Sequence, residues 1–264
     1  MNAAAEPVRI AMWSGPRNIS TAMMRAFENR PDTAVIDEPF YGAYLTTTGL
    51  DHPLREAVLK SQPTDWRVAA AALLGPVPGG RRVFYQKHMT HHMVAEVGRD
   101  WMAGCRHAFL IRSPERVLAS YAARRAKVSL ADIGFTQQAE LFDGEAQRLG
   151  APPPVVDAED VLGDPEGVLR ALCDALGIDF LADMLRWPTG RRATDGVWAP
   201  AWYDAVERST AFGPRRPVVV LEDLDESLKP IAAAARPHYE RLARYRLSAG
   251  GAGASPRQLG KARD

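Results

Sequence analysis

The sequence predicts an α/β fold: one domain with a central, mostly parallel, five-stranded sheet flanked by helices. Two observations lead to this prediction. Short apolar runs alternate with helical segments along the chain, and proline or glycine marks most of the boundaries between them. In addition, no internal repeat or linker divides the chain before residue 248, and 264 residues suffice for one large domain with a full core.

The strands are expected where a short apolar run lies between turn-forming residues, because a strand covered on both faces is apolar throughout. Five such runs occupy residues 8–13, 33–37, 82–88, 107–112 and 154–157. Residues 217–221 form a sixth possible strand. The carboxyl ends of parallel strands share one edge of a sheet, so the loops after the first four strands should face a common cleft.

The helices are expected from their start and stop signals. Residues 20–30 should be helical up to Pro31, which disfavours helical geometry in the residue before it. Residues 114–125 begin with proline in the first turn, where a missing N–H does no harm. Residues 164–176 should be capped by Asp164 and closed by Gly177. The fold is therefore expected to occupy residues 1–247, followed by a small-residue, disordered tail at 248–264.

Charge and composition exclude several classes of partner. The formal net charge is +1, so no global field favours nucleic acid, and no stretch approaches the roughly 18 apolar residues of a membrane span. The N-terminus lacks the basic start and apolar core of a signal peptide. Cys105 and Cys173 form no CxxC pair, which fits a reducing cytoplasm.

A metal site is not expected. His88, His91 and His92 cluster in the sequence, and three histidines can ligate zinc. However, His88 and His92 would share a face only within a helix, whereas His88 ends a predicted strand.

The first loop joins a strand to a helix and can bind a phosphate group. A helix N-terminus offers unpaired N–H groups and partial positive charge. Arg17 adds a full charge, while Gly15 allows close approach of a ligand. The loop lacks the lysine of a Walker A motif. The alternative to phosphate binding is that the loop is only a tight turn with a capping serine. The candidate residues are Ser14, Gly15, Pro16, Arg17, Asn18, Ile19, Ser20 and Thr21.

A second segment supplies another possible phosphate contact. Arg112 ends the fourth strand, and Ser120 lies eight residues later, a little over two helical turns into the next helix. Both could bind one phosphate group. Alternatively, the arginine pairs with a nearby carboxylate and the serine faces solvent.

Together these segments resemble the nucleotide-binding pair of the sulfotransferase family, whose fold is P-loop NTPase-like and whose sulfuryl donor is 3′-phosphoadenosine 5′-phosphosulfate. The resemblance implies that residues 14–21 bind the 5′-phosphosulfate, with Arg17 in place of the family's lysine or arginine. It also implies that Arg112 and Ser120 bind the 3′-phosphate. Residues 156–165 are similar to the family's segment after the fifth strand. Arg191 and Arg192 resemble the late basic segment that closes over the 3′-phosphate.

The resemblance suggests two candidates for the catalytic base. His88 matches a histidine at the end of the third strand, and Glu38 lies in a Glu-Pro segment similar to that of some bacterial members. The sequence does not choose between them. The family often has a lysine where this chain has Gln86, and strand alternation should point Lys87 away from His88. The lysine that would assist the leaving group is then expected to be missing, or its role to pass to Arg17.

The function implied is sulfuryl transfer from this donor to a hydroxyl or amine of an unspecified small-molecule or lipid acceptor. The alternatives are a P-loop kinase or nucleotide hydrolase using ATP, and a non-catalytic nucleotide-binding protein with the same fold. Tyr41 and Tyr44 could shape the acceptor pocket, and Trp198 and Trp202 could cover either ligand, whereas Trp13 is expected in the core.

Overall fold

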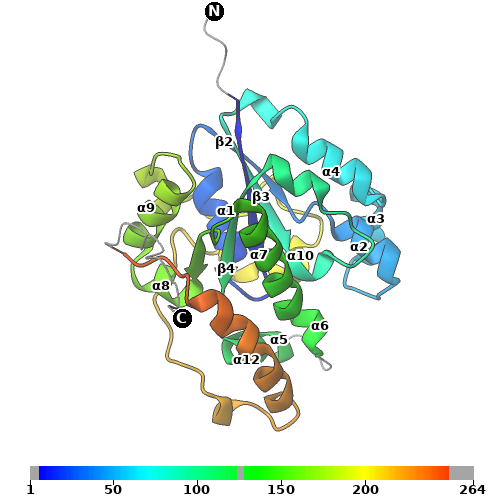
Figure 1. Ribbon diagram of the computed structural model, residues 1–264, viewed down its shortest axis with the longest axis vertical. Helices are drawn as coiled ribbons and strands as arrows, with labels where there is room; N and C mark the ends of the chain where they lie inside the picture. Colours follow the sequence, from blue (N-terminus) through cyan, green and yellow to red (C-terminus); the bar gives the residue numbers. More distant parts are fainter. Residues whose placement is uncertain (1–5, 124–127, 250–264) are drawn as a thin grey trace, which may run out of the picture.

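The computed structural model describes residues 6–123 and 128–249, and it contains a five-stranded sheet. The strand order is β2-β3-β1-β4-β5, and all four neighbouring pairs are parallel. The strands are β1 Val8–Ser14, β2 Thr33–Asp37, β3 Val83–Met89, β4 Arg106–Ile111 and β5 Val155–Asp157 (Figure 1). Each lies within a residue of its predicted range, so the predicted fold class is confirmed.

The helices surround this sheet and include several short 3₁₀ turns, written η (Figure 1). In chain order they are α1 Ser20–Glu28, α2 Tyr41–Thr48, α3 Arg55–Ser61, α4 Trp66–Leu74, η1 Pro78–Gly80, η2 Thr90–His92, η3 Asp100–Gly104, α5 Pro114–Ala122, α6 Leu130–Ile133, α7 Phe135–Leu149, α8 Ala158–Gly163, α9 Pro165–Ala175, η4 Ala182–Leu185, α10 Ala199–Trp202, α11 Asp204–Glu207, η5 Leu221–Asp223 and α12 Lys229–Ala243.

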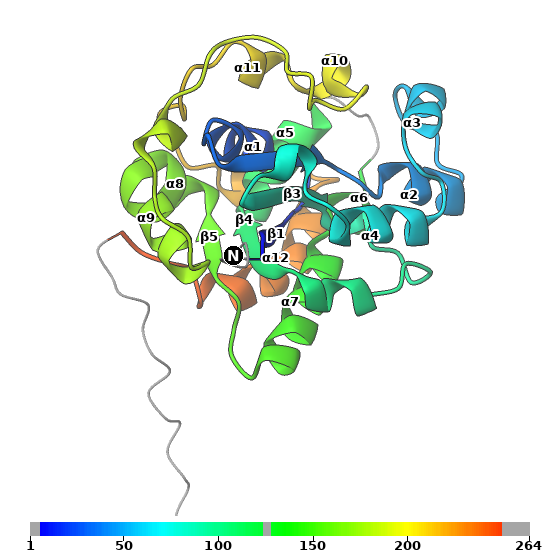
Figure 2. The same ribbon diagram turned by 90° about the horizontal axis from the view of Figure 1, so that it is seen from above.

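Two apolar layers sandwich the sheet, because side chains alternate between its faces. On β1, Ile10 and Met12 pack with α1, α8 and α9, while Ala11 and Trp13 pack with α4, α7 and α12. Figure 2 shows α1 on one side of the sheet and α7 and α12 on the other. These four residues of β1 are fully buried, which confirms Trp13 as a core residue.

Two helix predictions can be compared with the structure at their ends. Asp164 caps α9, with its side chain accepting a hydrogen bond from the Gly167 N–H at 2.9 Å, as predicted. The helix predicted over 114–125 ends as α5 at Ala122, and residues 124–127 lie outside the described part of the chain.

The sixth strand predicted at residues 217–221 is wrong. This stretch is extended but pairs with no strand of the described chain, and it leads into η5. Val218 is 78% exposed and Val220 is 46% exposed, so the apolar run that suggested a strand is not buried. Arg216, directly before this stretch, lines the cavity described below.

The predicted limits of the domain, residues 1 and 247, stay predictions. Residues 250–264, most of the predicted tail, lie outside the described residues.

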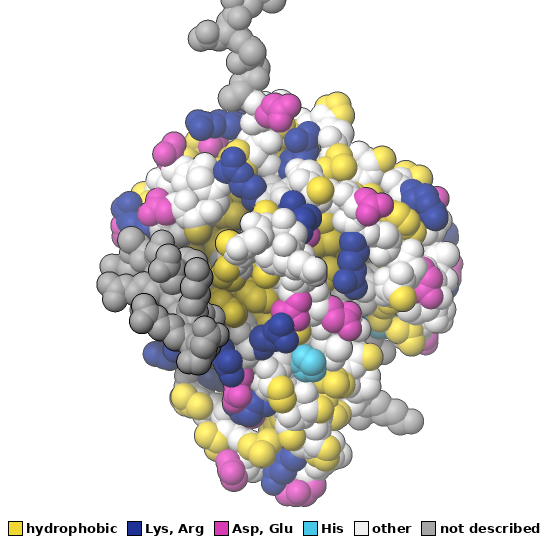
Figure 3. Space-filling view, in the orientation of Figure 1, with side chains coloured by type: hydrophobic (Ala, Val, Ile, Leu, Met, Phe, Trp, Pro, Cys, Tyr) yellow, Lys and Arg dark blue, Asp and Glu magenta, His cyan; other side chains and the backbone are white. Residues whose placement is uncertain are grey.

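Among the residues that are described, no helix is both long and apolar enough to cross a membrane. Basic and acidic side chains are interspersed on the face shown in Figure 3, so an anion-binding site requires locally clustered charges.

Candidate active site

A cavity of about 470 Å³ lies where the carboxyl ends of the strands meet. Four parts of the chain line it: residues 16–22 of the first loop, the ends of β2, β3 and β4 with the segments that follow them, Leu162 of α8, and the stretch from Trp198 to Arg216. Figure 2 shows α10 and α11, which belong to the last stretch, on the same side of the sheet as α1. The predicted common cleft is therefore present.

The first loop presents its residues to this cavity from Pro16 onward. Ser14 and Gly15 lie beneath the surface and do not line it. A Cβ atom on Gly15 would lie only 2.7 Å from the Ile133 carbonyl oxygen, so this position has room for glycine alone. Helix α1 has no acidic residue in its first turn and no side-chain cap. Its N-terminus therefore retains the positive character that attracts an anion.

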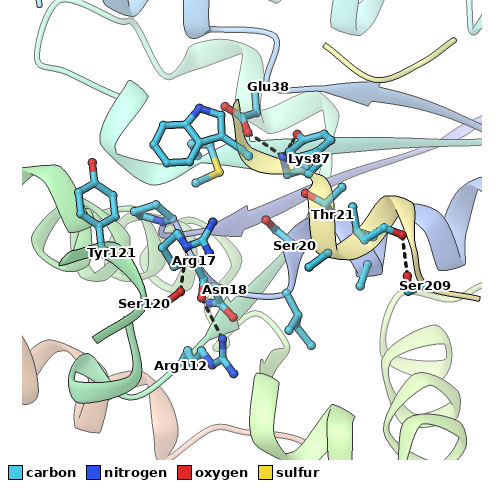
Figure 4. Close-up of a pocket in the computed structure, with 18 of the residues that line it drawn as sticks. Arg17, Asn18, Ser20, Thr21, Glu38, Lys87, Arg112, Ser120, Tyr121 and Ser209 are labelled. Atoms are coloured by element: carbon cyan, nitrogen blue, oxygen red, sulfur yellow. Dashed lines mark hydrogen bonds and ion pairs between the residues drawn. The ribbon is translucent and has the colours of Figure 1, made fainter. Parts of the chain in front are cut away.

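The two predicted phosphate segments meet at one end of the cavity. Arg17 Nε donates to Ser120 Oγ at 2.9 Å, and Arg112 Nη1 donates to the Arg17 carbonyl oxygen at 3.0 Å. Figure 4 shows these two contacts. Asn18 Nδ2 donates to the Leu110 carbonyl at 2.7 Å, which fixes the loop to the end of β4. Residues about one hundred positions apart thus share one surface, as the family resemblance implied.

Positive charge is in excess at this end. Arg112 and Arg116 both approach Glu159, at 3.0 and 3.5 Å, and Arg216 lines the cavity beside them. Burial lowers the pKa of Arg112, Glu159 opposes that shift, and the neighbouring Arg116 and Arg216 add to it. Two guanidinium groups at the Glu159 carboxylate, with a third at Arg216, leave a local surplus of cations, which suits a multiply charged anion.

Across the cavity, Glu38 and Lys87 form a buried ion pair (Figure 4). Lys87 Nζ lies 2.6 Å from Glu38 Oε1, 2.8 Å from Asp37 Oδ1 and 2.7 Å from the Tyr203 hydroxyl. Burial raises the pKa of Glu38; Lys87 counteracts this and Asp37 reinforces it. Burial alone would lower the pKa of Lys87, but Asp37 and Glu38 hold it well above its ordinary value.

His88 lies away from the cavity. Its ring is 1% exposed, stacks on Trp13 at 4.5 Å and lies 3.2 Å from the Gln86 side-chain oxygen. Burial lowers the pKa of His88 well below its ordinary value. Strand alternation does separate Lys87 from His88, as expected, but the cavity lies on the lysine side, together with Met89. Lys87 of β3 therefore reaches the cavity, on the face of the strand opposite to His88.

The late basic pair also lies elsewhere. Arg191 is exposed, and Arg192 donates to the Pro188 carbonyl at 2.9 Å; neither lines the cavity. Arg216, which sequence reasoning missed, lines the cavity. The signal was present, since residues 213–216 repeat the pattern of a glycine shortly before two arginines.

Beyond Glu38 the cavity wall is aromatic. Tyr41 stacks on His92 at 4.6 Å and meets Trp198 edge-on at 5.1 Å, and His91 and Trp202 line the same part. Burial lowers the pKa of His91 to about 3 and that of His92 well below its ordinary value, so both rings are neutral.

Tyr44 packs behind this wall, stacked on His92 at 4.8 Å, and does not line the cavity. Within residues 6–123 and 128–249, no group of three or more His, Cys, Asp or Glu side chains is arranged to hold a metal ion.

Known proteins resemble this chain over most of its length. In Arabidopsis thaliana, a branched-chain-amino-acid aminotransferase-like protein 1 is 38% identical over 209 residues, which is 79% of this chain and 37% of the relative. This chain spans little more than a third of the curated relatives it matches.

Two solved sulfotransferases share the fold. A protein from Alicyclobacillus acidocaldarius aligns with a TM-score of 0.52 and 15% identity, covering 91% of this chain and 97% of that one. The sulfotransferase domain of the Synechococcus PCC 7002 olefin synthase aligns with a TM-score of 0.51 and 19% identity, covering 88% and 95%. The profile of the sulfotransferase domain matches residues 8–244, so this chain belongs to the sulfotransferase family and has its P-loop-like fold.

Proposed function

We propose that this sulfotransferase moves a sulfuryl group from 3′-phosphoadenosine 5′-phosphosulfate to a hydroxyl or amine of a small-molecule or lipid acceptor. One observation carries the proposal. A single cavity combines a cationic end, formed by Arg17, Arg112 and Arg216, with a buried carboxylate–ammonium pair at Glu38 and Lys87. The first feature suits a bisphosphate donor, and the second suits proton removal from an acceptor.

The donor's two anionic groups have separate partners in this proposal. The N–H groups at the start of α1 and the Arg17 side chain would bind the 5′-phosphosulfate. Arg112 and Ser120 would bind the 3′-phosphate, and Arg216 would close over it from the segment that follows α11. Charge-assisted, two-pronged contacts from arginine favour such a phosphate over a neutral group.

Glu38 is the proposed catalytic base. Its carboxylate takes the proton as the acceptor oxygen or nitrogen forms its bond to sulfur, and the bond from sulfur to the 5′-phosphate oxygen breaks. Negative charge then builds on that leaving oxygen. Lys87 and Arg17 would stabilise it, since both groups line the cavity and are cationic. The aromatic wall beyond Glu38 would receive the acceptor.

A cytoplasmic setting forms part of the proposal. Both cysteines, Cys105 and Cys173, are free and buried, which suits a reducing compartment.

The first experiment is calorimetric titration with 3′-phosphoadenosine 5′-phosphate, with ATP titrated alongside, both without and with magnesium. We expect micromolar binding of the bisphosphate and weaker binding of ATP under both conditions. A clear preference for magnesium–ATP would instead favour a kinase or nucleotide hydrolase. Bisphosphate binding without transfer of ³⁵S from labelled donor to any member of a broad acceptor panel would favour a non-catalytic nucleotide-binding protein.

A further inference from the structure

Asp37 lies directly beside the proposed base but takes no part in the mechanism above. It ends β2, is 4% exposed and does not line the cavity, whereas Glu38 does. Both of its carboxylate oxygens are occupied. Oδ1 accepts from Lys87 at 2.8 Å, and Oδ2 accepts from the Tyr203 hydroxyl at 2.7 Å and the Gly196 N–H at 3.1 Å.

We propose that Asp37 is a positioning residue, an inference that rests on the proposed function. Asp37 acts as the permanent counter-ion of Lys87. The Lys87 ammonium therefore stays paired while Glu38 accepts the acceptor's proton and later releases it.

The count of charges supports this role. Lys87, Asp37 and Glu38 together carry a net charge of −1 when all three are ionised, so protonation of Glu38 makes the buried group neutral. Without Asp37, the lysine and glutamate would already be neutral, and protonation would leave an unpaired buried cation. Because an unpaired charge in the interior is costly, Asp37 makes Glu38 a stronger base.

The hydrogen bonds assign different tasks to the two carboxylates. Asp37 accepts from three donors, an ammonium, a phenol and a backbone amide, and these stabilise its negative charge. Glu38 accepts from Lys87 at Oε1 and borders the space into which an acceptor would enter. The proton is therefore expected on Glu38, and the lasting negative charge on Asp37.

The other ionisable groups nearby do not share the titration. Burial raises the pKa of Tyr203 well above its ordinary value, so its hydroxyl stays protonated and serves as a hydrogen-bond donor. Burial likewise keeps His91 and His92, from η2, uncharged near neutral pH. Lys87 stays cationic, because both carboxylates raise its pKa.

The test measures the proton on Glu38 directly and needs no acceptor. The full chain is labelled with ¹³C at the glutamate side-chain carboxyl, and the resonance lost in Glu38→Gln identifies Glu38. Its pH midpoint is then compared in wild type, Asp37→Asn and Lys87→Gln. We expect the midpoint to fall in Asp37→Asn and to rise in Lys87→Gln. Loss of packing would instead move both variants toward the value of an ordinary glutamate.

An unchanged midpoint in folded Asp37→Asn would overturn the proposal. Should that variant not fold, the comparison of Lys87→Gln with Asp37→Asn/Lys87→Gln isolates the same charge, and the double variant is expected to have the lower midpoint. Equal midpoints in that pair also overturn it. Binding of 3′-phosphoadenosine 5′-phosphate, measured separately, tests the proposed function, so failure of one idea can be told from failure of the other.

Discussion

Replacing Arg112 by alanine should mainly weaken binding of the donor's 3′-phosphate, with a smaller loss at the first loop, where Arg112 donates to the Arg17 carbonyl oxygen. The Arg112 side chain is 10% exposed and lines the cavity, so its contact with an anion is largely shielded from water. A charge-assisted hydrogen bond of this kind contributes about 1.5–3 kcal/mol, which corresponds to about a ten- to 150-fold rise in Kd. Among the described residues, removal also leaves Arg116, at 3.5 Å, as the ion-pair partner of Glu159, whose charge is then less compensated beside the anion, so the upper part of that range is expected.

The assay compares two ligands by calorimetry. For 3′-phosphoadenosine 5′-phosphate the variant should show the full loss, whereas adenosine 5′-phosphate, which lacks the 3′-phosphate, should lose much less affinity. Arg170→Ala is a matched control, because Arg170 is an exposed arginine that pairs with Glu166 and does not line the cavity. Equal losses for both ligands, or no loss for either, would refute the assignment of Arg112 to the 3′-phosphate.

Three other comparisons have expected outcomes. Glu38→Gln should lower kcat by about 10²–10⁴ with donor affinity intact, as judged by ³⁵S transfer, while His88→Gln should leave proton transfer in place; the reverse order would restore the histidine as base. Gly15→Ala should destabilise the fold by about 1–3 kcal/mol and weaken donor binding, because its Cβ meets backbone; unchanged thermal unfolding would contradict this. Arg25→Ala breaks a buried ion pair of 2.7 Å and should cost about 3–5 kcal/mol by urea unfolding, against at most about 1 kcal/mol for the exposed Arg67→Ala.

Most of the proposed anion-binding half of the site, apart from Arg191 and Arg192, could be predicted from sequence, because it depends on local patterns. The first loop follows a strand and precedes a helix, and the spacing of Arg112 and Ser120 places both on elements beside it. The catalytic half depends on which face of β3 borders the cavity. Alternation showed that Lys87 and His88 diverge, but no local pattern shows which side the cavity occupies, and the family's lysine–histidine spacing pointed to the other side.

Segments without regular structure account for the remaining differences. The run at 217–221 is apolar enough for a strand, yet tertiary packing leaves it exposed and unpaired within the described chain. Arg216, just before it, reaches the cavity because of where this irregular segment passes, which depends on long-range contacts. Tyr203 was missed for the same reason, since its partner Asp37 is 166 residues away.

The backbone at Arg17 and Glu38 shows what this site demands of the protein. Both residues have left-handed backbone geometry, with φ of 56° and 43°. Glycine adopts this conformation at a lower steric cost than residues that carry a Cβ atom. Improvement guided by folding stability alone would favour glycine at both positions. It would thereby remove the cation assigned to the donor and the base assigned to the acceptor, so these two turns mark where reactivity and robustness impose opposite choices on the sequence.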